Sequence, residues 1–260
     1  WSLTRGKAVK VAVIDTGIDY DHPALKGNYC GGVNILHPLL SPHDHNGHGT
    51  HVAGTIAGRA LDMGIIGVAP RAHIYAVKAF NRRGTANLSD LLSAINWCIE
   101  NKMQVVNMSF GMDKMSESLR RAIYNAYRKG IVMLAAAGNK GTYGKVDFPA
   151  RYPETIAVTA TDKRGQIASF SNHGHEVDVA APGEMIPSSW TNGGTREMSG
   201  TSMAVPHVVG TVALLLYLRP DLTAEQIRRI LAASSIPVSG AGVGRVNAYR
   251  SVQMLLHTRI

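Results

Sequence analysis

The order of apolar runs along the chain predicts an α/β fold in three layers, with a mostly parallel central sheet and helices on both of its faces. Short runs rich in β-branched residues alternate with longer helical patterns. Strands that alternate with helices form parallel sheets whose two faces are both covered. The length of 260 residues suits one large domain, and no repeat, low-complexity tract or linker divides it. We therefore expect a single domain over residues 1–260.

The individual elements follow from the same patterns. Apolar runs predict strands at residues 9–14, 74–77, 105–108, 131–136, 156–158 and 177–180. Helical patterns cover residues 50–60, 88–101, 116–129, 202–218 and 224–233. Gly130 is suited to end the third helix, and Thr223 with Gln226 forms a capping box that begins the last one. The element boundaries are therefore encoded locally.

The distribution of charged and apolar residues argues against nucleic acid and membrane as partners. The chain has 27 Lys and Arg against 18 Asp and Glu, a formal charge of +9. The basic residues stand as scattered pairs, such as Arg120 with Arg121, which is typical of solvated helix faces and not of a nucleic-acid stripe. The longest apolar run, residues 208–218, is shorter than the ~20 residues that span a bilayer. We expect no nucleic-acid partner and no membrane span.

The two cysteines, Cys30 and Cys98, are too few for a disulfide framework. Cys98 lies in a helical pattern and is expected to be a small core residue. The sequence leaves open whether the two pair.

Three short segments carry an Asp, a His and a Ser in fixed order: Asp15 in VAVIDTGID, His48 in NGHGTHVAG and Ser202 in GTSMAVPH. A serine hydroxyl becomes a nucleophile when a neighbouring imidazole takes its proton. A carboxylate on the other ring nitrogen orients that imidazole and stabilises its charged form. Ser202 also begins a helical pattern, whose N-terminus favours negative charge on a reacting oxygen. These residues predict hydrolysis by a nucleophilic serine.

The three segments resemble the signature segments of the subtilase family of serine proteases, which carry Asp, His and Ser in this order. A fourth segment, LAAAGN at residues 134–139, resembles the oxyanion-hole strand of that family. The resemblance implies that Asn139 and the backbone N–H of Ser202 bind the oxyanion. It runs from about residue 10 over nearly the whole chain, and it implies a serine endopeptidase without an organic cofactor. It gives His51 and His207 only packing and hydrogen-bonding roles.

Other chemistries fit the residues less well. Asp-Thr-Gly also occurs in aspartic proteases, but these need a second carboxylate motif, which the chain lacks. The His and Asp residues at 43–51 would suggest zinc, but there is no HExxH helix and no CxxC pair. A peptide-binding relative without catalysis would not need the complete residue set. An esterase would share the acyl-enzyme chemistry, but Ser202 is not in a Gly-x-Ser-x-Gly motif.

By the same resemblance, an extended peptide substrate pairs with two backbone segments. These are Ser109, Phe110 and Gly111, and Ala136, Ala137 and Gly138. The pocket floor matches residues 147–149, where Asp147 supplies a carboxylate and predicts a preference for Lys or Arg before the scissile bond. Lys140 at the pocket rim would neutralise Asp147 if the two formed an ion pair. The sequence leaves both outcomes open.

The metal sites of the family are expected to be reduced. Many subtilases bind calcium tightly after the catalytic Asp and His, where this chain has Ala24 and Leu61, which offer no side-chain oxygen. The tight calcium site is therefore expected to be absent. A weak site for calcium or a monovalent cation is expected at Glu176 and Asp178.

The resemblance also sets the expected biology. It implies protein or peptide substrates and an inhibitory propeptide before processing. It further implies secretion, with a signal and a propeptide that are not present in this chain removed first. We expect a monomer that needs no cofactor.

Overall fold

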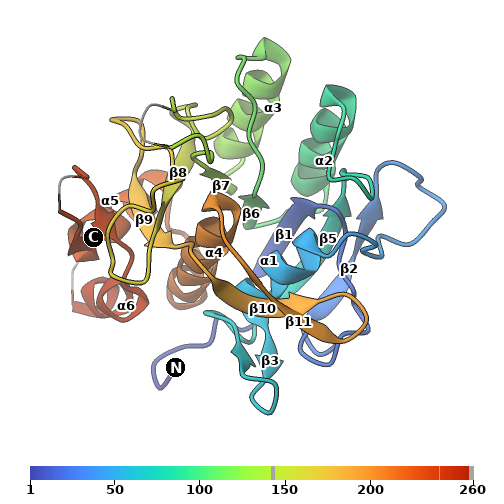
Figure 1. Ribbon diagram of the computed structural model, residues 1–260, viewed down its shortest axis with the longest axis horizontal. Coiled ribbons are helices and arrows are strands. Elements are labelled where there is room, and N and C mark those ends of the chain that lie inside the picture. The colour runs from blue at the N-terminus through green and yellow to red at the C-terminus, as the bar shows by residue number, and fades with distance from the viewer. Residues whose placement is uncertain (142–143, 240, 258–260) are drawn as a thin grey trace.

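The computed structural model describes residues 1–141, 144–239 and 241–257. A nine-stranded sheet crosses the molecule in the order β12-β13-β9-β8-β7-β6-β1-β5-β2 (Figure 1). Its strands are β1 (Lys10–Asp15), β2 (Tyr29–Asn34), β5 (His73–Lys78), β6 (Val105–Met108), β7 (Val132–Ala136), β8 (Thr155–Thr161), β9 (Val179–Pro182), β12 (Ile236–Pro237) and β13 (Gly244–Arg245). Every pairing in this sheet is parallel except that of β12 with β13.

Helices cover both faces of the sheet. They are α1 (His48–Ala57), α2 (Leu88–Glu100), α3 (Glu117–Arg128), α4 (Thr201–Leu218), α5 (Ala224–Ser234) and α6 (Ala248–His257). In Figure 1, α2 and α3 lie together on one side of the strands, and α1 and α4 on the other. Successive side chains of β1 divide between the two cores: Val11 and Val13 pack with α1 and α4, and Ala12 and Ile14 with α2 and α3. The predicted three-layer fold is confirmed.

The predicted elements are present with shifts of a few residues at their ends. The hydroxyl of Ser116 accepts the N–H of Leu119 and caps α3, and Gly130 follows that helix with a φ of 81°. The structure adds elements that were not predicted: β2, α6, β12 and β13, and the hairpins β3 (Arg59–Ala60) with β4 (Ile65–Ile66) and β10 (Ile186–Trp190) with β11 (Gly194–Met198). Both cysteines are free thiols, Cys30 exposed and Cys98 buried.

Helix α4 is the buried centre of one layer. Among the described residues it is the one helix long and apolar enough to cross a membrane, and 78% of that stretch is buried inside the fold. A Cβ atom at Gly210 would lie 2.6 Å from Cβ of Val68, so this glycine allows the close approach of the preceding loop. Packing against the sheet accounts for the apolar composition of α4.

The strand order places a switch point next to β1. The chain passes from β1 to β2 and β5 on one side of it, and then crosses to β6 on the other side. Open α/β sheets bind ligands outside the carboxyl ends of their strands at such a point. Asp15 is the last residue of β1, and Ser109 directly follows β6.

The capping box of α5 allows a test of whether local side chains stabilise the start of this helix. Thr223 Oγ1 accepts the N–H of Gln226 at 3.2 Å, and Gln226 Oε1 accepts the N–H of Thr223 at 2.9 Å. We expect Thr223→Ala to lower the free energy of unfolding by about 1 kcal/mol, because it leaves helical N–H groups without their partner. Urea unfolding of chains that carry Ser202→Ala, which prevents self-cleavage, measures this loss.

The matched control is Thr223→Ser, which keeps the hydroxyl and is expected to stay within about 0.5 kcal/mol of the parent. Equal stabilities for the Ala and Ser variants would contradict the capping role.

Candidate active site

Asp15 and His48 form a hydrogen-bonded pair where β1 ends and α1 begins. Nδ1 of His48 lies 2.7 Å from Oδ1 and 2.9 Å from Oδ2 of Asp15. Asp15 is 3% exposed, and its carboxylate also accepts the N–H of Thr16. A buried carboxylate on Nδ1 keeps the proton there and leaves the lone pair of Nε2 available as a base.

The pKa of His48 reflects two opposing effects. Burial of the ring lowers the pKa, whereas the charge of Asp15, the hydrogen bond to it and the charge of Asp44 raise it. The carboxylates prevail, so the pKa of His48 lies above its ordinary value of 6.5. The imidazolium form is therefore stabilised, as a general base in hydrolysis requires.

Asp44 holds the two halves of this pair in place. It is 1% exposed, and its carboxylate accepts the hydroxyls of Thr16 (2.9 Å) and Thr50 (2.7 Å) and the N–H groups of Gly47 and Thr50 (3.0 Å each). Thr16 Oγ1 in turn accepts the N–H of Gly49 at 3.0 Å. The sequence considered Asp44 only as a metal ligand. Asp44 lies three residues before Gly47, the N-cap residue of α1, so the usual capping pattern does not identify it and its role depends on the path of the loop.

Ser202 is the second residue of α4 and is half-buried. Its hydroxyl donates to the carbonyl of Ser109, and the hydroxyl of Ser109 donates to the carbonyl of Ser202, both at 2.9 Å. Among the described residues, the Ser202 hydroxyl has no hydrogen bond to His48. His48 and Ser109 line the same cleft of about 260 Å³, so the Ser109 link brings Ser202 to this cleft.

Asn139 lies beside the start of α4. Its Oδ1 accepts the N–H of Thr201 at 2.8 Å and the hydroxyl of Thr201 at 2.9 Å. These bonds leave Nδ2 as the free donor, on the side of Gly200, where a Cβ atom would lie 3.5 Å from it. The amide is thus fixed with its donor near the backbone that leads into Ser202.

The two expected substrate segments continue past the point where β6 and β7 stop pairing with each other. Pairing of β6 with β7 ends at Met108 and Ala135, so residues 109–111 and 136–138 extend beyond it. The N–H of Asp147 donates to the carbonyl of Ala137 at 2.8 Å. Met112 and Phe148 exchange backbone hydrogen bonds of 2.8 and 2.9 Å. The 147–148 segment therefore joins both backbones from one side.

The carboxylate of Asp147 lies between Gly111 and Gly138. A Cβ atom at Gly111 would be 2.8 Å from its Oδ2, and one at Gly138 would overlap it. Nζ of Lys140 lies 2.9 Å from Oδ1 of Asp147 and also contacts the carboxylate of Asp113. Lys140 thus forms the ion pair that was one of the two outcomes left open by the sequence.

Glu176 and Asp178 are held by two separate arginines. Oε1 of Glu176 lies 3.1 Å from Nε of Arg151, and Oδ1 of Asp178 lies 3.0 Å from Nε of Arg228. Oδ2 of Asp178 accepts the N–H of Ala157 at 2.8 Å. A cation here would compete with these two ion pairs, and the weak cation site expected from the sequence stays a prediction. Absence of the tight calcium site stays a prediction.

Two further histidines near the site, the buried His51 and the half-buried His207, have pKa values that keep them neutral at pH 7. Burial lowers the pKa of His51 and of His207 to about 4. A ring nitrogen of His51 bonds the carbonyl of Ile186 at 2.9 Å, and one of His207 bonds that of Met203 at 2.9 Å. These bonds are the structural roles that the sequence gave them.

A family model described as the subtilase family matches residues 6–252. The chain belongs to the subtilase family. A thermostable alkaline protease of Halalkalibacterium halodurans is 43% identical over 251 residues, covering 95% of this chain and 68% of that protein. Subtilisin E of Bacillus subtilis is 43% identical over 255 residues, covering 95% and 66%. A cold-adapted subtilisin-like serine proteinase of known crystal structure superposes with a TM-score of 0.86 at 36% identity, covering 94% of this chain and 88% of that one.

Family membership confirms the class of chemistry expected from the sequence. This subtilase is a serine endopeptidase, and the likeness to the cold-adapted proteinase confirms the three-layer fold. The chain spans about two thirds of the length of the two curated relatives.

The Asp15–His48 pair predicts a measurable titration. In NMR spectra of the histidine rings we expect His48 to titrate above 6.5. Asp15→Asn is expected to bring the pKa below 6.5, because burial of the ring remains while the charge is lost. His207, half-buried and without a carboxylate partner among the described residues, serves as the internal control with a pKa of about 4.

The raised pKa of His48 also determines how the stability of the folded chain changes with pH. A raised folded-state pKa stabilises the folded chain below pH 6.5, and this contribution is lost as pH rises through the pKa of His48. A His48 pKa at or below 6.5 in the parent chain would contradict the electrostatic account.

Proposed function

We propose that this subtilase cleaves peptide bonds with Ser202 as nucleophile, His48 as general base and acid, and Asp15 as the group that orients His48. Asn139 and the N–H of Ser202 bind the oxyanion. The observation that carries the proposal is the 2.7 Å contact of His48 with Asp15, in a cleft shared with Ser109, which is itself bonded to Ser202. The order of these residues and the family support the same roles.

The first step follows from the hydrogen bonds of the free chain. A serine hydroxyl rotates about one bond, so substrate binding lets Oγ of Ser202 exchange the Ser109 carbonyl for Nε2 of His48. His48 takes the proton as Oγ attacks the peptide carbonyl, and Asp15 stabilises the imidazolium. The charge that develops on the carbonyl oxygen accepts hydrogen bonds from Nδ2 of Asn139 and the N–H of Ser202.

The remaining steps return the enzyme to its starting state. The tetrahedral intermediate collapses, the C–N bond breaks, and His48 gives its proton to the leaving amine. Water then attacks the acyl group on Ser202, with His48 again as base, and releases the acid product. These steps need no cofactor.

The proposed substrate groove uses the two strand extensions. An extended peptide adds between residues 109–111 and 136–138 through main-chain hydrogen bonds. Asp147 lies at the floor of the pocket for the residue before the scissile bond and favours Lys or Arg there. The ion pair with Lys140 weakens this preference, because it offsets part of the negative charge.

We base the proposed domain extent, oligomeric state and location of the enzyme on the same family membership. We propose that residues 1–260 act as one catalytic domain and as a monomer on protein or peptide substrates outside the cell. An inhibitory propeptide is proposed to precede the active form. The extent of the family match supports the domain boundaries, and the subtilisin relatives support the extracellular setting.

Kinetics of two variants test the catalytic roles. We expect Ser202→Ala to lower kcat about 10⁶-fold, the scale found when the nucleophile of a subtilisin is removed. Asn139→Ala is expected to lower kcat about 10²–10³-fold with little change in KM, because the amide acts on charge present only in the transition state. Initial rates on a chromogenic peptide, with folding checked by circular dichroism, measure both.

The control is Ser199→Ala, a neighbouring serine whose hydroxyl accepts the N–H of Met185. It is expected to leave kcat within about twofold. A Ser202→Ala chain that retains more than about 1% of parent kcat would refute the nucleophile assignment.

A second pair of variants tests the pocket charge. We expect Lys140→Ala to raise the ratio of kcat/KM for Arg over Phe substrates about tenfold, since it frees the Asp147 carboxylate. Asp147→Asn is expected to lower the same ratio below that of the parent. Matched peptides that vary only in this residue provide the measurement, and an unchanged ratio in Asp147→Asn would place the carboxylate outside the pocket.

A further inference from the structure

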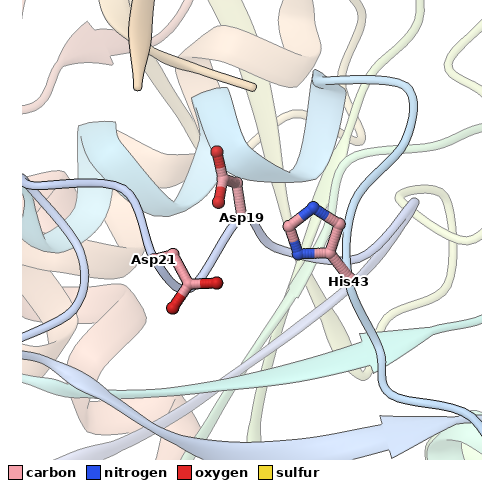
Figure 2. A group of neighbouring side chains, drawn as sticks. All are labelled: Asp19, Asp21 and His43. Atoms are coloured by element: carbon pink, nitrogen blue, oxygen red, sulfur yellow. The ribbon is translucent and has the colours of Figure 1, made fainter. Parts of the chain in front are cut away.

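Asp19, Asp21 and His43 form a group of metal-binding side chains that the proposed mechanism does not use. Each offers one ligand atom, and these atoms all lie within 4.8 Å of one another. Figure 2 shows the two carboxylates and the imidazole facing a common space. The two aspartates belong to the segment after β1, and His43 belongs to the loop before α1.

Within the part of the chain that the structure describes, the three side chains have no other polar partner. Asp19 is 4% exposed, yet its carboxylate has no hydrogen bond or ion pair with any residue in 1–141, 144–239 or 241–257. Within the same ranges, the carboxylate of Asp21 and the ring nitrogens of His43 have no such bond either. A cation in this space would neutralise a carboxylate that no described residue pairs with.

Lys78, a buried cation close to His43, has other hydrogen-bond partners. Lys78 donates from Nζ to the carbonyl of His43 at 3.0 Å and also contacts the carbonyl of Thr16. It forms no ion pair with Asp19 or Asp21 among the described residues. Among the described residues, neither carboxylate therefore forms an ion pair.

Three of the other His and Asp residues at 43–51 have partners of their own. The carboxylate of Asp44 accepts hydrogen bonds within its own loop and helix. His48 is hydrogen-bonded to Asp15, and His51 to the carbonyl of Ile186. The zinc cluster considered from the sequence is thus divided by the fold. The exposed His45 packs edge-on against the ring of His43 at 5.2 Å but is not in the group, so among the described residues His43 is the imidazole that meets Asp19 and Asp21.

The types of ligand atom in this group indicate which metal ion it would bind. Calcium takes six to eight oxygen ligands, whereas one imidazole nitrogen with two carboxylates suits a first-row transition metal such as zinc. Zinc–ligand bonds of about 2.0–2.2 Å place ligand atoms at most roughly 4.4 Å apart, which small side-chain rotations would reach here. We propose that Asp19, Asp21 and His43 bind one Zn²⁺ ion, with water completing its coordination.

Such an ion would fasten the two segments that support the catalytic pair. Ile18 donates its N–H to the carbonyl of Pro42 at 3.1 Å, and Asp44 donates its N–H to the carbonyl of Ile18 at 3.3 Å. The metal would add a third link between the same segments. Zinc binding should therefore stabilise the folded chain.

Titration of the Ser202→Ala chain with ZnCl₂ tests the site without self-cleavage. Isothermal titration calorimetry is expected to show one Zn²⁺ per chain, and zinc at about 100 times Kd should raise Tm by about 5 °C. His43→Gln is expected to weaken zinc binding at least tenfold and to remove the rise in Tm. His37→Gln, an exposed histidine outside the group, is the matched control and should leave both values unchanged.

Asp21→Asn is a second test at an exposed position, which keeps the proposal open to refutation if His43→Gln does not fold. Unchanged zinc affinity in both variants, or no binding at millimolar ZnCl₂, would overturn the site. A rise in Tm with CaCl₂ alone would overturn the choice of ion. None of these results depends on catalysis, so they leave the proposed protease function to its own test.

Discussion

The hydrogen bonds of Asp44 are the interaction on which the Asp15–His48 pair, the proposed catalytic pair, depends. The first N–H groups of a helix have no partner within the helix, and this buried carboxylate accepts those of Gly47 and Thr50 at the start of α1. It also accepts the hydroxyl of Thr16, which directly follows Asp15. One side chain therefore fixes the end of β1 against the beginning of α1. Gly49 makes this approach possible, since a Cβ atom there would overlap the carbonyl of Gly17.

The other half of the site is assembled in the same way, by side chains that join strand ends to the start of α4. Ser109 after β6 exchanges two hydrogen bonds with Ser202, and Asn139 after β7 binds Thr201. Because β7, β6 and β1 are neighbours in the sheet, their carboxyl ends deliver Asn139, Ser109 and Asp15 to one edge. The chemistry of the family then follows from strand order and two helix N-termini, with the sheet as the rigid support.

The sequence predicted the features that depend on local pattern. Strands buried on both faces read as continuous apolar runs, so β1 and β6 were evident, whereas β2 was missed because Gly31 and Gly32 interrupt it. Gly32 is there because a side chain would overlap the backbone of Ala76, a tertiary reason invisible in sequence. The same limit applies to side-chain partners. Glu176 and Asp178 form ion pairs with arginines that lie far from them in the sequence, Arg151 and Arg228. The ion pair of Lys140 with Asp147 likewise depends on the folded structure and could not be decided from the sequence.

The central claim is that the fold makes one serine, Ser202, reactive through His48. Intact-mass measurement after treatment with phenylmethanesulfonyl fluoride, which sulfonylates activated serines, tests this most directly. We expect one adduct per chain, located on Ser202 by peptide mapping, no adduct in Ser202→Ala, and much slower labelling in His48→Ala. An adduct on a different serine such as Ser109, or no adduct in a folded sample, would contradict the account.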